Sequence, residues 1–410
     1  MSEVMAVPKL RFKEFDGDWS QSRIGEIFQV TSGSTPLRSD NRFFENADIV
    51  WVKTTDLNNG LIEKTEEKIS QIALKETSVK ILPKGTVFVA MYGGFNQIGR
   101  TGLLVHEAAC NQALSAIYPN EKIDSYFLLT FLNHKVDDWK NFAASSRKDP
   151  NITKSDVLAF PLKYPVKEEQ TKIASFLSAV DEKISQLTQK HALLSQYKQG
   201  MMQKLFSQQI RFKADDGSEF GEWASEKISK VFTNKSKSFN PLLNESLPCI
   251  ELEHLSQNTG QILGTVNSSD QQSTKNLFEP NSVLYGKLRP YLRKFAKPQF
   301  KGVCSSEIWV LTGLKISNDY LFQFVQSEQF TELTNIQSGS KMPRADWNVI
   351  ADAEIKFPCI EEQTKIANFL SAIDQKIEVT AQQIEQAKTW KKGLLQQMLD
   401  RKSTRLNSSH

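Results

Sequence analysis

The sequence predicts an α+β protein made of two similar halves, in which two heads of mixed strands and helices are separated by two long antiparallel coiled-coil helices. Three observations predict this fold. One segment is repeated almost unchanged, the repeated segment has the apolar period of a coiled-coil helix, and the stretches between the copies alternate strand-like runs with turns. At 410 residues the chain is also too long for one ordinary core, so more than one domain is expected.

The internal repeat occupies residues 168–184 and 361–377. These segments read EEQTKIASFLSAVDEKI and EEQTKIANFLSAIDQKI, and fourteen of their seventeen positions are identical at an offset of 193. A looser similarity opens each half, where KLRFKEFDGDW ends at Trp19 and IRFKADDGSEFGEW ends at Trp223. The stretches between share little identity. A duplicated chain of this kind has one fold with two different binding surfaces.

Each repeat begins a long helix. Apolar residues recur at steps of mostly four and three over 173–205 and 366–398, with Lys198 filling one position of the seam, which is the a/d pattern of a coiled coil. Neither segment contains proline, and each follows one, at Pro165 and Pro358, as suits the start of a helix. About 39 residues of helix span roughly 58 Å. Because one such helix cannot bury its apolar stripe alone, we expect the two copies to pack antiparallel.

The heads are predicted to be α+β. Head one alternates apolar runs with turns and then continues as a helix, with strands at Ile49–Val52, Thr86–Met91, Leu103–His106 and Ala113–Tyr118 and the helix at Ser125–Asn141. Head two repeats this order, with strands at Val283–Lys287 and Glu307–Thr312 and a helix near Asp319–Thr334. The predicted domains are head one (1–165), a central helix (166–208), head two (209–358), a C-terminal helix (359–400) and a tail (401–410). The tail breaks the heptads, and we expect it to be disordered or non-native.

Composition and motifs exclude several classes of protein. The chain is 39% hydrophobic and 24% charged, has no apolar run of about eighteen residues, and opens without a secretory h-region, so we expect a cytoplasmic protein. Four cysteines lie far apart, as expected for reduced, buried side chains: Cys110, Cys249, Cys304 and Cys359.

Common catalytic and cofactor motifs are absent. The sequence has no G-x-G-x-x-G, H-E-x-x-H or G-x-S-x-G, and no N-P-P-Y or D-P-P-Y. The stretch from Gly94 to Thr101 has phosphate-loop spacing, but arginine replaces the lysine and the following residues predict a strand instead of a helix. Glu251, Glu253 and His254 are interpreted as a polar strand face. We therefore expect no catalytic site, no metal and no cofactor on this chain.

Signals for nucleic-acid binding are local, since the net charge is only +4. Between Pro280 and Ser306 there is no acidic residue but six basic ones, namely Lys287, Arg289, Arg293, Lys294, Lys297 and Lys301. Lysine and arginine neutralise phosphates, and arginine also reads guanine edges. Head one instead offers amide-rich loops suited to adenine, together with three basic residues; the candidates are Asn96, Gln97, Arg100, Arg147 and Lys148.

Several segments together resemble the specificity subunit family of type I restriction–modification enzymes. They are PKLRFKEFDGDW, TSGSTP followed by WVKTTDL at Trp51–Leu57, LPKGTVFVAMYG, and FPLKYPVKEEQTKIASFLSAVDEKI with its second copy. The resemblance extends to about residue 400, and the doubled E-E-Q-x-x-I-x-x-F-L-x-x-x-D-x-x-I element is its specific part. Head two departs from the pattern, because it has PCIELEHL (Pro248–Leu255) in place of a clear counterpart of WVKTTDL.

The resemblance implies a non-catalytic subunit with two target-recognition domains, each reading one half of a bipartite site in double-stranded DNA. It implies that the helices set the spacer and dock two methyltransferase (modification) subunits, and that restriction subunits join the assembly. S-adenosylmethionine, ATP and Mg would then be bound by partner subunits. The predicted DNA contacts also include residues of the WVKTTDL segment and of the loop before Trp347. The full set is Lys53, Thr54, Asn96, Gln97, Arg100, Arg147, Lys148, Lys287, Arg289, Arg293, Lys294, Lys341 and Arg344.

One alternative belongs to a different class. The chain is then a coiled-coil scaffold that binds two protein partners, and its basic stretch is incidental. Retention on duplex DNA that falls steeply with salt distinguishes the two hypotheses, since counterion release is a property of DNA binders. A nuclease is a third hypothesis, but the sequence offers no convincing carboxylate cluster for it.

Overall fold

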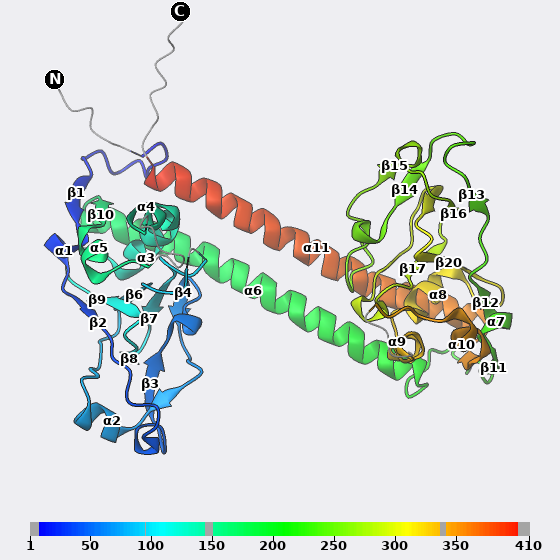
Figure 1. Ribbon diagram of the computed structural model, residues 1–410, viewed down its shortest axis with the longest axis horizontal. Helices are drawn as coiled ribbons and strands as arrows, with labels where there is room; N and C mark the ends of the chain where they lie inside the picture. Colours follow the sequence, from blue (N-terminus) through cyan, green and yellow to red (C-terminus); the bar gives the residue numbers. More distant parts are fainter. Residues whose placement is uncertain (1–7, 95, 144–150, 337–341, 401–410) are drawn as a thin grey trace, which may run out of the picture. The chain divides into compact units, whose positions relative to one another are not determined.

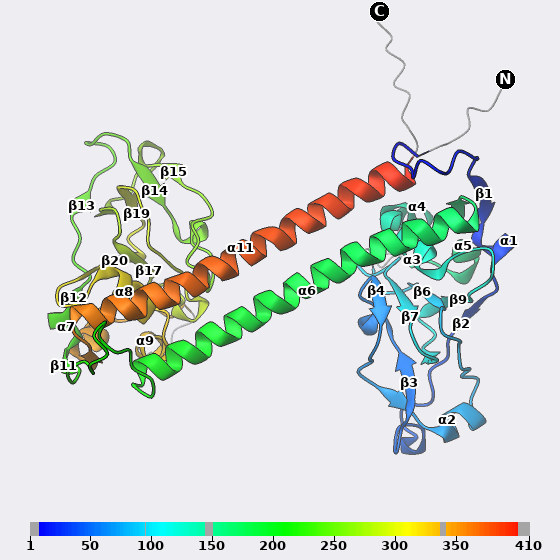
Figure 2. The same cartoon turned by 180° about the vertical axis from the view of Figure 1, so that it is seen from behind.

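The computed structural model describes residues 8–94, 96–143, 151–336 and 342–400. The chain forms two compact units, one of residues up to Leu187 together with those from Gln383 onward, and the other of Thr188–Gln382. Each unit therefore combines one head with one half of each long helix (Figures 1 and 2). The tail expected to be disordered or non-native lies outside the described residues.

Two helices of 40 residues each, α6 (Lys167–Phe206) and α11 (Ile360–Leu399), confirm the predicted pair. In the first unit the start of α6 packs beside the end of α11, and Leu177 is buried in one core with Leu394. In the second unit the end of α6 packs beside the start of α11, where Leu205 shares a core with Ile366. The two helices are thus antiparallel within each unit. No helix among the described residues is long and apolar enough to cross a membrane.

Head one consists of two small sheets, each of which packs against helices. The larger sheet has the order β2-β9-β6-β7-β4, formed by Val30–Ser32, Leu114–Ile117, Val87–Ala90, Thr101–Leu104 and Gly60–Ile62. The smaller has the order β5-β3-β8, formed by Lys68–Ile69, Ile49–Val52 and Ala109–Cys110. The helices are α1 (Ile24–Ile27), α2 (Gln71–Glu76), α3 (Ser125–His134), α4 (Trp139–Phe142) and α5 (Lys154–Ala159).

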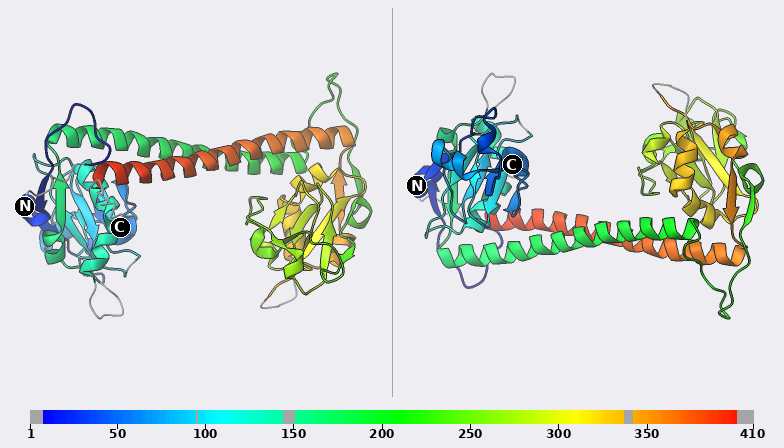
Figure 3. Two further views of the ribbon diagram at one scale, coloured as in Figure 1. Left: turned by 90° about the horizontal axis from the view of Figure 1, so that it is seen from above. Right: turned by 90° about the horizontal axis from the view of Figure 1, so that it is seen from below.

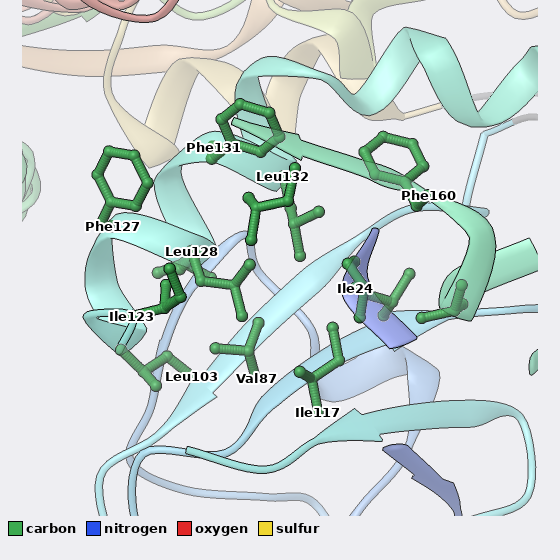
Figure 4. Packing of buried hydrophobic residues seen from close by; sticks show 14 of the residues in the cluster. Ile24, Val87, Leu103, Ile117, Ile123, Phe127, Leu128, Phe131, Leu132 and Phe160 are labelled. Carbon is green, nitrogen blue, oxygen red and sulfur yellow. The ribbon is translucent and has the colours of Figure 1, made fainter. Parts of the chain in front are cut away.

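The main core of head one lies between its larger sheet and the helices near α6 (Figure 4). Val87 and Ile117, which are paired across β6 and β9, meet the apolar face of α3 there. The core continues into the start of α6 through Ile173 and Leu177. Burial of this shared apolar surface fixes the head on the helix.

Head two repeats this plan with different residues. Its sheets have the orders β12-β20-β17-β18, formed by Phe232–Thr233, Ile308–Gly313, Val283–Gly286 and Phe295–Ala296, and β13-β16-β19-β14-β15, formed by Ser238–Phe239, Lys275–Phe278, Gly302–Cys304, Pro248–Ile250 and Val266–Asn267. The helices are α7 (Ile228–Val231), α8 (Asn318–Phe324), α9 (Glu328–Asn335) and α10 (Trp347–Asp352). In each unit the head lies to one side of its own helix halves (Figure 3).

Short antiparallel strand pairs, which the sequence analysis did not predict, close each head at its junction with a long helix. They are β1 (Ser20–Arg23) with β10 (Pro161–Tyr164), and β11 (Ala224–Lys227) with β21 (Glu354–Phe357). Each pair joins the first strand of a head to the strand that leads directly into α6 or α11. Their alternation of apolar and polar residues is too brief to be a signal in the sequence.

The second Glu and the Gln of the repeated E-E-Q segment are buried in both copies, so both copies depend on the same internal contacts. Glu169 is 0% exposed, and Arg11 donates to both of its carboxylate oxygens at 2.7 and 2.6 Å. Glu362 is also 0% exposed, and Arg211 donates to it at 3.1 and 2.7 Å. These ion pairs fasten the arm that precedes each head to the first turn of a long helix.

Candidate nucleic-acid interface

The first element of the candidate interface is a 3-10 turn that follows a strand. In head one this strand belongs to the smaller sheet, and head two has a counterpart of the turn. In head one the turn is η2 (Thr54–Asp56), and the N–H of Lys53 donates to Asp56 Oδ2 at 2.7 Å. In head two it is η4 (Leu252–His254), and the N–H of Glu251 donates to His254 Nδ1 at 3.0 Å. The preceding strands, β3 and β14, both run parallel to a neighbour, β8 or β19. PCIELEHL is therefore the structural counterpart of WVKTTDL, and head two departs from the pattern in its residues but not in its fold.

The second element is the loop that follows β6 in head one and β17 in head two. Its described residues are 91–94 and 96–100 in head one and 287–294 in head two. Both loops are held at their first residue, where the N–H of Ile152 donates to Met91 O at 3.0 Å and the N–H of Ala345 donates to Lys287 O at 2.8 Å. These equivalent loops carry seven of the predicted contacts, namely Asn96, Gln97, Arg100, Lys287, Arg289, Arg293 and Lys294.

The two elements lie close together in each head. In head one the residues just beyond them are hydrogen-bonded: the N–H of Asn59 donates to Thr101 O, and the N–H of Thr101 donates to Asn59 Oδ1, both at 3.0 Å. In head two Lys294 Nζ donates to Leu252 O at 2.6 Å. The structure thus brings together residues that are 40 or more positions apart in the sequence.

In head two the loop after β17 presents its tip on a constrained backbone. Arg289 (φ 51°) and Arg293 (φ 47°) are left-handed and flank the 3-10 turn η6 (Pro290–Leu292). This region is unusual for residues other than glycine, so the surrounding hydrogen bonds must hold it. One of them is the bond from the N–H of Arg289 to Pro343 O, at 2.7 Å. The exposed side chains of Arg289 and Tyr291, the latter 55% exposed, are consequently presented on a fixed turn.

Basic residues of head two differ in whether their charge is already paired. Lys287 and Arg289 form no ion pair with any described residue, whereas the other cations of the region contact acceptors within the head. The pairs are Arg293 with Glu328 (3.2 Å) and Gln326 O, Lys294 with Leu252 O, Arg344 with Glu307 (3.1 Å), Lys297 with Asp319, and Lys301 with Glu279 (3.2 Å). The paired cations hold the loops in shape, so a paired cation that contacts DNA first has to give up its partner within the head. Lys287 and Arg289 have no such ion pair with a described residue to give up.

Among the described residues, head one carries fewer unpaired charges in the equivalent turn and loop. Lys53 Nζ lies 2.8 Å from Glu67 and 3.1 Å from Glu66, and the hydrogen bond to Glu67 raises the pKa of Lys53. Asn96 is exposed, while Thr54, Gln97 and Arg100 are half-buried. Arg147, Lys148 and Lys341 lie outside the described residues. The amides and Arg100 are thus the polar groups that this loop offers to a ligand.

Each of these loops carries one exposed tyrosine. Tyr92, the second residue after β6, is 46% exposed, and Tyr291, the fifth residue after β17, is 55% exposed. The sequence analysis did not select Tyr92, although its place between a four-residue apolar strand and two glycines was a usable signal. Tyr285, in contrast, is buried, and its hydroxyl is 3.2 Å from Thr334 Oγ1. It belongs to the core of head two. No cluster of three or more His, Cys, Asp or Glu able to hold a metal occurs among the described residues.

Comparison with known proteins defines the family. The model of the type I restriction modification DNA specificity domain matches residues 16–196 and 222–389, once for each head and the start of its long helix. The chain therefore belongs to the family of type I restriction–modification specificity subunits.

Several members of this family are similar over most of the chain. The MjaVIII specificity subunit of Methanocaldococcus jannaschii is 24% identical, covering 95% of both chains. The EcoDI specificity subunit of Escherichia coli is 23% identical, covering 93% of this chain and 87% of that protein. The match to the M. jannaschii MjaIX subunit, 25% identical, covers 60% of this chain and 61% of that protein.

The fold also matches a solved structure. The type I restriction–modification S subunit of M. genitalium has a TM-score of 0.61 at 15% identity, and the match covers 96% of this chain and 98% of that chain. At this identity the likeness concerns the fold alone.

Proposed function

We propose that each head reads one half of a bipartite site in double-stranded DNA through its 3-10 turn and the adjoining loop after β6 or β17. One observation carries the proposal: both heads present the same pair of elements, but with different side chains. The loop of head one carries the amides Asn96 and Gln97, which suit adenine, whereas the loop of head two carries arginines, which suit guanine. A duplicated fold with two chemistries at one place is what the reading of two different half-sites requires.

Within head two the contacts divide by chemistry. Arg289 is exposed, unpaired among the described residues and fixed on the η6 turn, so it is the candidate for direct reading of a base. Lys287 likewise forms no ion pair with a described residue and can neutralise a phosphate. Arg293 and Lys294 hold the loop in shape through Gln326 O and Leu252 O. This division follows from their partners and was not evident from the sequence.

The long helices also offer equivalent apolar positions for partner subunits. Tyr197 and Trp390, which are related by the offset of 193, are 52% and 54% exposed. Each unit contains one of them, Trp390 with its ring 6.1 Å from Phe176 in the first unit. Exposed aromatic side chains are typical anchors of protein interfaces. Two such positions suit two methyltransferase subunits.

Catalysis in the assembly is then the work of partner subunits. The methyltransferase subunits carry S-adenosylmethionine, and restriction subunits, where they join, use ATP and Mg. This chain contributes recognition and the distance between the half-sites, and we expect it to show neither methylation nor cleavage when purified alone. Turnover by the isolated chain would contradict this assignment.

The test is to map methylated adenines in DNA treated with the assembled methyltransferase. Arg289→Ala should cost about 1–3 kcal/mol of specific binding and relax one base position in one half-site. Lys301→Ala, in which an already paired cation is removed, is the matched control and should leave the recognised sequence unchanged. If Arg289→Ala alters neither affinity nor sequence, this loop is not the reader. DNA binding by the wild-type chain that does not weaken with salt would favour the scaffold hypothesis.

A further inference from the structure

The same ion pair joins α6 to α11 in both units. In the first unit Lys391 Nζ lies 2.5 Å from Asp181 Oδ1, and in the second Lys198 Nζ lies 2.6 Å from Asp374 Oδ1. The offset of 193 relates Asp181 to Asp374 and Lys198 to Lys391. The duplication has therefore produced two copies of one contact. In the first unit α6 supplies the aspartate and α11 the lysine, and in the second unit α11 supplies the aspartate and α6 the lysine.

Each pair also binds the head of its own unit. Tyr126 of α3 donates its hydroxyl hydrogen to Asp181 Oδ2 at 2.7 Å. Gln323 of the equivalent helix α8 donates to Asp374 Oδ2 at 3.2 Å. Each aspartate thus bonds to the lysine of the other long helix with one oxygen and to the head with the other. We name these two three-way contacts the helix–head junctions.

The junctions are partly shielded from water, the lysines more than the aspartates. The side chains of Lys198 and Lys391 are 11% and 24% exposed, and those of Asp374 and Asp181 are 34% and 35% exposed. Burial lowers the pKa of Lys198, and Asp374 opposes this effect. Gln326 accepts a second hydrogen bond from Lys198 Nζ at 2.6 Å. Lysines desolvated to this extent are tolerated because a carboxylate lies opposite them.

The position of the lysines in the seam makes the contact specific for one register. Apolar a/d seams tolerate a slip of one heptad, because another apolar residue replaces each lost neighbour. Lys198 and Lys391 lie on that seam, where each leaves its aspartate if α11 slips along α6. Lys391 lies opposite Asp181, so a slip of seven residues brings it level with Ala174 or Thr188, neither of which carries a charge. In a slipped register Lys198 and Lys391 therefore have no aspartate opposite them, whereas in the observed register both lysines are paired.

We propose that the two helix–head junctions select the register of α6 against α11 and so fix the spacer length that the protein accepts between its half-sites. Head one leads directly into α6 through β10, and head two leads directly into α11 through β21. The register of the two helices consequently sets where each head is held along the pair. The inference rests on the proposed function, and it identifies Asp181, Lys198, Asp374 and Lys391 as positioning residues for spacer recognition.

The experiment replaces both ion pairs by apolar residues of similar size, through Asp181→Leu, Lys198→Met, Asp374→Leu and Lys391→Met together. Replacing buried ion pairs in this way often preserves stability. The variant is assembled with methyltransferase subunits and tested on DNA libraries that keep both half-sites and vary the spacer. We expect the wild-type preference for one spacer to fall at least tenfold, with new spacers up to about three base pairs different, since a heptad rises about 10 Å. Glu385→Leu with Lys388→Met, which removes an exposed pair within α11, is the matched control and should keep the single spacer.

The outcomes are decisive in each case. A folded four-residue variant that keeps the wild-type spacer overturns the proposal. The two-residue variants, which remove one pair at a time, are tested in parallel, so the question remains decidable if the four-residue variant does not fold. Exchanging the charges of both pairs should restore a single spacer, and several spacers in that variant would contradict a role for ion pairing. A wild-type protein that specifies no bipartite site would instead refute the proposed function itself.

Discussion

The arm that precedes head one provides a sharp energetic test, because its Arg11 is paired with a fully buried carboxylate. Glu169 is 0% exposed, and both of its oxygens accept hydrogen bonds from Arg11, at 2.7 and 2.6 Å. Arg11→Met removes both donors and leaves a buried charge without a partner, which costs about 3–5 kcal/mol. In a unit of about 200 residues each kcal/mol lowers the melting temperature by about 2–4 °C, so we expect a decrease of about 6–20 °C.

The same arm supplies the control. Glu14 pairs with Lys172 one helical turn further along α6, but both side chains are nearly half exposed. Glu14→Gln should therefore cost less than about 1 kcal/mol. Combining Arg11→Met with Glu169→Gln removes the buried charge as well and should recover most of the loss. Calorimetry or denaturant unfolding measures all of these variants, and a decrease below about 2 °C for Arg11→Met would refute the reasoning.

The second unit repeats the contact with one difference. Glu362 accepts hydrogen bonds from Arg211 and also from Trp223 Nε1, at 3.1 Å. Trp19, the counterpart of Trp223, has no hydrogen-bond partner for its Nε1 among the described residues. Loss of Arg211 therefore leaves one donor on the carboxylate, and Arg211→Met should destabilise the protein less than Arg11→Met, by about 1.5–3 kcal/mol. Equal losses would mean that the indole bond contributes nothing.

Three further outcomes concern recognition of DNA. Replacing residues 209–355 with the matching segment of another family member should change one half of the methylated sequence and leave the other intact; altered specificity in both halves would contradict independent reading. Insertion of seven residues after both Ser185 and Glu378, which are equivalent positions, lengthens the helices in phase by about 10 Å and should add one to three base pairs to the spacer without changing the bases read; an unchanged spacer in an active assembly would exclude the helices as the ruler. Lys287→Ala should weaken binding to all duplexes and reduce the salt slope by about one unit, and an unchanged slope would remove Lys287 from the phosphate contacts.

The sequence determined the plan of the molecule. Identity between 168–184 and 361–377 established the duplication, and the heptad spacing established two long helices, because an apolar period is a local property that neighbours in the chain specify directly. The apolar runs of the heads likewise predicted β3, β6, β9, β17 and β20 and the helical region around α3 and α8. The family also followed from short segments that can be compared letter by letter.

Tertiary structure decided which polar residues are available for function. From the sequence, Arg289 and Lys294 are similar cations five positions apart, but the side chain of Lys294 reaches Leu252 O across the fold, while that of Arg289 forms no ion pair with any described residue. The sequence likewise shows Asp181 as one surface charge among many, and only the antiparallel packing places it against Lys391, 210 positions away. Contacts of this kind depend on the packing of distant segments, which composition and periodicity do not encode. The sequence by itself therefore determined the architecture and the family, and the tertiary structure decided which of the described charges are paired within the fold and which are not.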